Sequence, residues 1–183
     1  MTPRLFDMHC HLDRMADAEH VARDAEKRGL ACFDTTVSPA DATRARARFA
    51  GFANVRVGCG LHPWWLADGR CGAADIAAVA RDAKASPFIG EIGLDYAPRH
   101  EASRALQHAA LERILDAVAE HPLPHRAISL HAVRAASDVL DALERRKLIG
   151  RDAPTGTACI LHWFSGSSDE LTRARRLGCL FSV

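Results

Sequence analysis

The chain has 183 residues, which is enough for one domain with a substantial core, and we expect residues 1–183 to form a single domain. Hydrophobic residues make up 48% of the sequence and charged residues 26%, as is ordinary for a globular protein. The net charge of +1 excludes a strong global field for nucleic acid, so any polyanion must bind at a local patch. No apolar run approaches the ~20 residues of a membrane helix, and we expect no membrane partner.

Short apolar runs follow one another along the chain, separated by polar loops and alanine-rich stretches. The runs are Leu5–His9, Ala31–Val37, Val55–Gly60, Pro87–Glu91, Ala127–His131, Ala158–His162 and Gly178–Val183. Short apolar runs rich in Ile, Val, Leu and Phe are typical of buried parallel strands.

The stretches between these runs are amphipathic and predict helices. They are Ala16–Arg28, a helix that begins at Ser38, Ala73–Lys84, Arg104–Glu120, Ser137–Lys147 and Ser168–Leu177. Ser38 is a typical N-cap, because Asp41 follows it three residues later as in a capping box. Strands that alternate with helices favour a parallel sheet with right-handed crossovers. Since neither a G-x-G-x-x-G motif nor a Walker loop is present, the pattern favours an α/β TIM-like (β/α) barrel over an open sheet.

A closed eight-stranded barrel takes about 250 residues. This sequence reaches only a seventh strand candidate, Gly178–Val183. We therefore expect seven barrel strands here, an eighth strand absent from the chain, and a working protein longer than these 183 residues.

Imidazole and carboxylate groups stand at the ends of five strand candidates. They are His9 and His11 on the first, His62 on the third, Glu91 on the fourth, His131 on the fifth and His162 on the sixth. The carboxyl ends of barrel strands share one face. Side chains at i and i+2 of a strand point the same way, so His9 and His11 can reach one ion. A single H-x-H arises often by chance, but the five strand ends together predict a cluster that suits Zn²⁺, Mn²⁺ or a similar ion.

The segments around these residues resemble the TatD-like metal-dependent deoxyribonucleases of the amidohydrolase superfamily. The resemblance lies in Asp7–Asp13 (DMHCHLD), Gly60–Pro63 (GLHP), Ile89–Tyr96 (IGEIGLDY), Leu130–Ala135 (LHAVRA) and His162–Gly166 (HWFSG). These segments run in the family's order at roughly its spacing and cover the whole chain.

The resemblance implies two divalent metal ions (Zn, Mn or Mg) and a catalytic role for Glu91 as the carboxylate that bridges them. His9 and His11 would bind the first ion, and His131 and His162 the second. Two neighbouring ions can stabilise the charge on both the attacking and the leaving oxygen of a phosphodiester.

The resemblance also implies contacts with the substrate phosphate. His62 would lie near it, and Arg134 is a second candidate, although the family often places its arginine where Val133 stands. The family takes one more ligand of the first ion, an Asp, from strand eight, and no residue of this sequence matches it. Asp95 follows the fourth strand candidate and is a poor substitute by position.

The resemblance therefore implies a two-metal phosphodiesterase, a deoxyribonuclease that acts on DNA ends. One alternative is a hydrolase of small phosphoesters, esters or amides, which the nearly neutral charge favours slightly. Another is a non-catalytic truncated barrel that holds one metal ion as a structural clip. The oligomeric state stays open.

The tryptophans and cysteines each allow more than one role. Trp64 and Trp65 follow the GLHP turn, where they can stack on nucleobases or pack against a loop. Trp163 can line the wall of the pocket, but we expect it to pack instead. Six cysteines occur without a CxxC pair, and we expect them to be buried free thiols in a cytoplasmic protein without a signal peptide.

Overall fold

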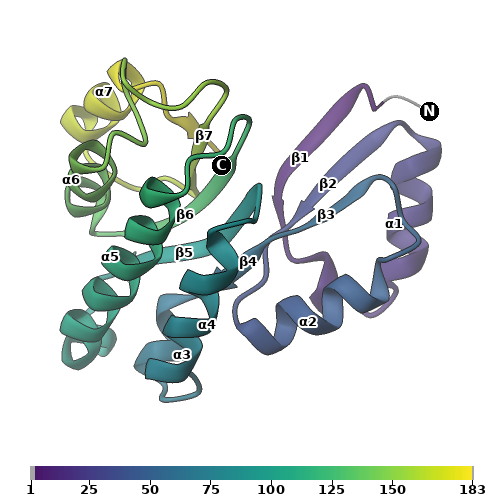
Figure 1. Ribbon diagram of the computed structural model, residues 1–183, viewed down its shortest axis with the longest axis horizontal. Helices are drawn as coiled ribbons and strands as arrows, with labels where there is room; N and C mark the ends of the chain where they lie inside the picture. Colours follow the sequence, from purple (N-terminus) through teal and green to yellow (C-terminus); the bar gives the residue numbers. More distant parts are fainter. Residues whose placement is uncertain (1–2, 183) are drawn as a thin grey trace.

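In the computed structural model, which describes residues 3–182, every strand pairing is parallel (Figure 1). One sheet has the order β1-β2-β3 and a second has the order β4-β5-β6-β7-β8. The strands are β1 (Leu5–Cys10), β2 (Leu30–Asp34), β3 (Val55–Val57), β4 (Cys59–Leu61), β5 (Phe88–Asp95), β6 (Ala127–Val133), β7 (Ala158–His162) and β8 (Leu180–Phe181). The predicted α/β class of TIM-like fold is thereby confirmed.

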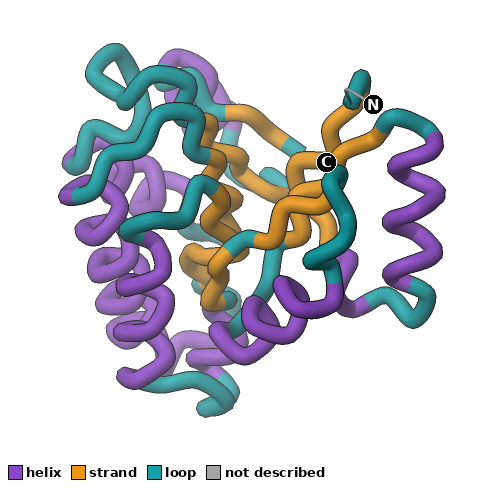
Figure 2. The backbone as a smooth tube through the Cα atoms, turned by 45° about the vertical axis from the view of Figure 1, so that its right-hand side comes forward, coloured by secondary structure: helices purple, strands orange, loops and turns teal. Residues whose placement is uncertain are grey.

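Helices lie outside the strands, as Figure 2 shows. They are α1 (Ala18–Lys27), α2 (Pro39–Arg48), α3 (Pro63–Ala67), α4 (Ala73–Ala83), α5 (Arg104–Glu120), α6 (Ala136–Arg145) and α7 (Ser168–Arg176), with short 3-10 turns η1 (Leu12–Arg14) and η2 (Pro98–Ser103). The predicted N-cap is confirmed, because the Ser38 hydroxyl accepts the Asp41 amide at 3.1 Å. The short helix α3 was not predicted from the sequence.

The third predicted strand is broken in two at Gly58. Its first half, β3, pairs with β2, whereas its second half, β4, pairs with β5. A side chain at Gly58 would meet the Phe33 ring at 2.6 Å, so only glycine allows this close crossing. The eight strands consequently occupy seven positions of the barrel wall. Within the described residues no pairing joins β8 to β1.

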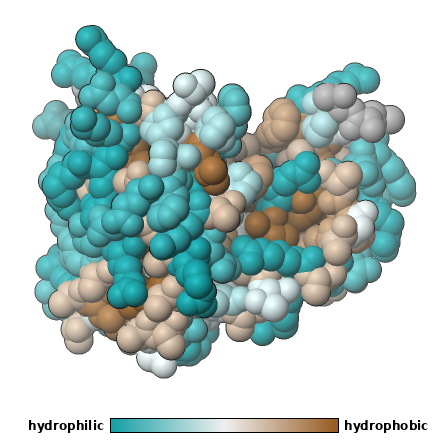
Figure 3. Space-filling view, viewed as in Figure 1, coloured by the Kyte–Doolittle hydropathy of each residue, from teal (hydrophilic) through white to brown (hydrophobic). Residues whose placement is uncertain are grey.

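The core has three parts. The largest packs β4–β7 against α4, α5 and α6, and a smaller one packs β1–β3 against α1 and α2. The third lies between the strands, where Phe33 of β2 meets Ala127 of β6 and Ile160 of β7. On the face shown in Figure 3, hydrophilic residues cover much of the left-hand part, and apolar residues line the hollow beside the N-terminal strands. All six cysteines are free, and five of them are buried. Among residues 3–182 no helix is long and apolar enough to cross a membrane.

Two glycines let β5 approach its neighbours. Gly90 and Gly93 have φ values of +147° and +146°, in the region that disfavours side chains. A Cβ atom at Gly93 would lie 2.0 Å from the carbonyl oxygen of His131 on β6. The pairing of β5 with β6 shifts register between Ile89 and Ile92, and this irregularity surrounds Glu91.

Replacement of Gly93 by alanine is expected to destabilise the fold by about 3 kcal/mol, because it adds both backbone strain and a clash with β6. Urea unfolding would measure the change. Gly51 is the matched control, since a Cβ atom there meets nothing within 4 Å, and Gly51→Ala should be nearly neutral. Equal stabilities of the two variants would contradict this account of the close approach.

Candidate metal centre

The carboxyl ends of the strands surround a cavity of about 420 Å³. Its lining combines imidazoles with apolar walls and one buried carboxylate. The lining residues are His11, His62, Trp64, Glu91, His131, Val133, His162, Trp163 and Ser165. Four of the strand-end histidines and the predicted carboxylate therefore face one space, and His9 lies directly behind it against the ring of His162.

Glu91 lies at the middle of this group, with its side chain only 2% exposed. Its Oε2 atom is 3.6 Å from His9 Nε2 and 3.2 Å from His11 Nε2. Its Oε1 atom is 2.9 Å from His131 Nδ1 and 3.5 Å from His62 Nε2. One carboxylate thus faces a pair of imidazoles with each of its oxygens.

Two sets of possible metal ligands follow from this geometry. The first is His9, His11 and Glu91, and the second is His62, Glu91 and His131, each with ligand atoms within 4.8 Å of one another. Three imidazole or carboxylate donors per set suit a divalent transition-metal ion. The buried charge of Glu91 has no Lys or Arg partner among its recorded contacts, so cations at these positions would compensate it.

The first pair of histidines is oriented by its neighbours. His11 Nδ1 donates to the carbonyl oxygen of Thr35 at 2.6 Å, which turns the Nε2 atom of the ring towards Glu91. His9 Nδ1 lies 2.6 Å from the hydroxyl of Ser129, on β6. Burial lowers the pKa of His9 to about 3, so its imidazole is neutral, as a metal ligand must be.

A second buried carboxylate, Asp95, holds His131 from the other side. Asp95 Oδ2 is 3.0 Å from His131 Nε2 and also accepts the indole N–H of Trp64 at 2.6 Å. Burial opposes protonation of His131, but its hydrogen bonds to Asp95 and Glu91 raise its pKa to about 9. In the metal-free centre a protonated His131 therefore balances the charge of Glu91, and His131 would have to lose its Nδ1 proton before that atom could serve as a metal ligand.

The hydrogen bonds of His62 and His162 suggest different roles for them. His62 Nδ1 accepts the amide N–H of Trp64 at 3.1 Å, so its Nε2 carries the proton of a neutral ring and is a donor. His162 pairs in register with His131, stacks on His9 with ring centroids 3.4 Å apart, and has Nδ1 2.8 Å from the hydroxyl of Ser182. Its Nε2 stays available as a ligand atom, although His162 lies outside both compact sets.

Arg134 lies apart from this group. It is exposed in the turn after β6 with a φ of +53°, and the neighbouring Val133 rather than Arg134 lines the cavity. Its contact with a substrate phosphate stays a prediction.

Sequence reasoning missed Thr35 and Ser129, and it considered Asp95 only as a poor substitute for the ligand of strand eight, not as the group that orients His131. Asp95 is the last residue of β5, four positions after Glu91, and this even spacing was the signal available for it. Gln107 on α5 accepts the Asp95 amide at 2.7 Å and donates to the Asp95 carbonyl at 3.2 Å, which fixes the end of the strand. Ser129 stands two residues before His131 and shares its side of β6.

Asp34, at the end of β2, is fully buried beside the centre. Its Oδ1 accepts the amide of Asp13 at 3.1 Å, and its Oδ2 has no hydrogen-bond partner among the described residues. Burial, together with the Asp13 carboxylate, raises the pKa of Asp34 to about 7. Because the pKa of an Asp in an unfolded chain is about 3.9, residue 34 loses its proton at a lower pH in the unfolded chain than in the folded protein. The contribution of Asp34 to stability is therefore greatest below about pH 4 and decreases towards about pH 7, by at most about 4 kcal/mol.

Replacement of Asp34 by asparagine should remove this dependence of stability on pH. The free energy of unfolding would be measured in urea with EDTA. As pH rises from about 4 to about 8, Asp34→Asn should become more stable relative to the wild type. Asp152→Asn, in an exposed loop, is the matched control and should leave the dependence unchanged. A difference for Asp34→Asn that does not vary with pH would rule out the raised pKa.

The parallel barrel wall with a His/Glu cluster at its carboxyl ends defines a TIM-like fold that carries a candidate centre for divalent metal ions. The family model described as TatD related DNase matches residues 6–183, and the chain belongs to this family. Similar solved structures are YJJV, a TatD homologue from Escherichia coli K12 (23% identity, TM-score 0.79), and a TatD family hydrolase from Entamoeba histolytica (17% identity, TM-score 0.72). The match with the Escherichia coli protein covers 99% of this chain and 68% of that protein. The match with the Entamoeba histolytica protein covers 100% of this chain and 65% of that protein. No curated protein matches the sequence.

Proposed function

We propose that this protein is a two-metal phosphodiesterase that removes nucleotides from DNA ends. One observation carries the proposal: Glu91, buried and anionic, directs each of its two oxygens to a different pair of imidazoles. A carboxylate in this position suits a bridge between two ions. Membership in the TatD family supports DNA as the substrate.

The cluster fits a pair of divalent cations, which would stabilise the developing charge on the attacking and leaving oxygens of a phosphodiester when bound. His9 and His11 would hold the first, and His131 and His162 the second, with Glu91 shared. The carbonyl of Thr35 and the carboxylate of Asp95 support these roles, because they keep protons on the ring nitrogens of His11 and His131 that face away from Glu91.

His62 is proposed as a donor to the substrate. Its Nδ1 accepts the amide N–H of Trp64, so Nε2–H could donate to an oxygen of a phosphate that is bound by the metal ions of the centre. Burial lowers the pKa of His62, so the neutral ring predominates at neutral pH. Trp64 and Val133 form apolar walls that keep water away from the charged groups.

Hydrolysis of an end-labelled single-stranded oligonucleotide tests the proposal, with Mn²⁺ and with EDTA. Stepwise shortening that requires Mn²⁺ is the expected result. A chromogenic phosphodiester without a nucleobase, assayed in parallel, separates DNA from small phosphoesters as substrate. Cleavage of that compound alone would overturn the assignment to DNA, and no hydrolysis of either substrate would overturn the enzymatic assignment.

A further inference from the structure

Trp163 projects from the lip of the metal centre into solvent. Its side chain is 75% exposed, which is more than any other large hydrophobic residue among those described, and it lines the cavity together with His162 and Ser165. The expected packing role is therefore wrong. Burial of an exposed indole face against a ligand removes apolar surface from water, and this lowers the free energy of the complex.

A strained backbone and a hydrogen bond fix the position of this side chain. Trp163 has a φ of +45°, which is strained for a bulky residue, and strain of this kind gathers at ligand sites. Its amide donates to the Ser182 hydroxyl at 3.2 Å, and the same hydroxyl lies 2.8 Å from His162 Nδ1. The position of the indole is thus coupled to that of a histidine of the centre.

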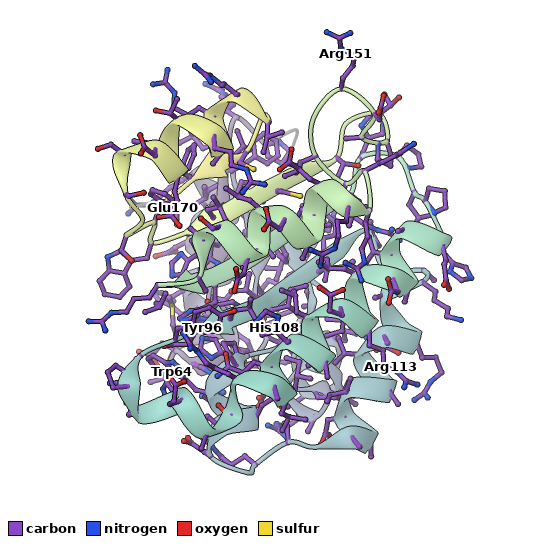
Figure 4. All side chains as sticks on the ribbon, turned by 90° about the vertical axis from the view of Figure 1, so that its left-hand side faces the viewer. Trp64, Tyr96, His108, Arg113, Arg151 and Glu170 are labelled. Atoms are coloured by element: carbon purple, nitrogen blue, oxygen red, sulfur yellow. The ribbon has the colours of Figure 1, made fainter. Side chains whose placement is uncertain are left out.

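The other two tryptophans at this end of the barrel are already engaged. Trp65 carries the guanidinium groups of Arg14 and Arg70 over its ring, at 4.7 and 3.8 Å from the centroid. Trp64 donates its indole N–H to Asp95, and Figure 4 shows it on the short helix below the strand ends. Among the described residues, no guanidinium covers Trp163, so its face is the one open for stacking.

The distance from Trp163 to the centre suits one nucleotide. Its ring centroid is 6.4 Å from that of His162, which in turn stacks on His9. A phosphate bound at the metal centre would leave the base of the adjoining nucleotide beside the indole. Every base has a flat π-face, so such a platform binds without selecting a sequence.

We propose that Trp163 is the stacking platform for the nucleobase next to the scissile phosphate. This inference rests on the proposed function, because it presumes a polynucleotide at the metal centre. It adds a subsite that binds the base, whereas the histidines and Glu91 form the centre at which the phosphate would bind. Trp163 is thus a specificity-determining residue that favours nucleotides over phosphodiesters without a base.

The test compares Trp163→Ala, Trp163→Phe and the wild type on two end-labelled oligonucleotides, one normal and one with abasic terminal nucleotides. For Trp163→Ala we expect KM on the normal oligonucleotide to rise by about 5- to 100-fold with kcat little changed. Trp163→Phe should restore most of the loss, and on the abasic oligonucleotide the three proteins should be alike. Phe6→Ala is the matched control, since Phe6 is 63% exposed at the opposite end of β1 and should leave KM unchanged.

The outcomes separate the two proposals. Wild-type cleavage of the normal oligonucleotide with the same KM for Trp163→Ala overturns the platform and leaves the nuclease intact. An equal rise in KM on both oligonucleotides also overturns it, because the contact would then not involve the base. No cleavage of either oligonucleotide by the wild type overturns the nuclease and the platform together. Equal melting temperatures of the variants will show that KM reports binding rather than folding.

Discussion

Replacement of Glu91 by glutamine is expected to reduce kcat on an oligonucleotide by about a thousandfold or more. The amide keeps the shape of the side chain but removes the negative charge that faces two pairs of imidazoles. It also offers a single oxygen where a bridge needs two. Loss of about 4 kcal/mol of transition-state stabilisation corresponds to this factor.

The metal content should fall with the activity. Buried hydrogen bonds from His11, His131 and His62 hold the pKa of Glu91 far below its usual range despite burial, so the wild-type carboxylate is ionised at any working pH. Elemental analysis after dialysis should find fewer ions per chain in Glu91→Gln than in the wild type. Glu26→Gln, on the exposed face of α1, is the matched control for the same chemical change. Retained turnover in Glu91→Gln would exclude a mechanism that depends on a shared carboxylate.

Arg126→Met is expected to cause the largest loss of stability, about 3–5 kcal/mol. Arg126 precedes β6 and is 2% exposed, yet it pairs with no carboxylate within residues 3–182. Its guanidinium instead donates five hydrogen bonds of 3.0–3.3 Å to backbone carbonyls at the ends of α4 and α5 and in the segments that follow them. The acceptors are Ala83, Lys84, Ser86, Val118 and His121. Methionine fills similar space but leaves these buried carbonyls without donors.

Thermal unfolding in EDTA should show this loss as a decrease in Tm of about 10 °C for a chain of this size. Arg126→Lys should fall between the wild type and Arg126→Met, because an ammonium group has three donors rather than five. Arg113→Met is the matched control, since Arg113 lies exposed on α5 (Figure 4) and should change Tm little. Similar Tm values for Arg126→Met and Arg113→Met would show that the carbonyls find other donors.

Much of this protein follows from local sequence patterns. The helix predicted at Arg104–Glu120 has those bounds in the structure, and the start of α2 follows from Ser38 and Asp41. The i, i+2 spacing of His9 and His11 and the placement of Glu91 and His131 near strand ends depend only on strand geometry and parallel order. Such features need no knowledge of which distant segments touch, so the sequence alone predicted the fold class and the gathering of these side chains at one end of the barrel wall.

Other features depend on contacts between distant segments, which only the tertiary structure decides. The break at Gly58 arises because the third strand changes partner from β2 to β5, and the burial of Arg126 arises because α4 and α5 end beside it. Asp95 matters because the pairing of β5 with β6 brings it to His131. The exposure of Trp163 depends on how its turn is held by Ser182, nineteen residues along the chain. Register, crossing points and burial are set by packing across the whole barrel, and no local pattern encodes them.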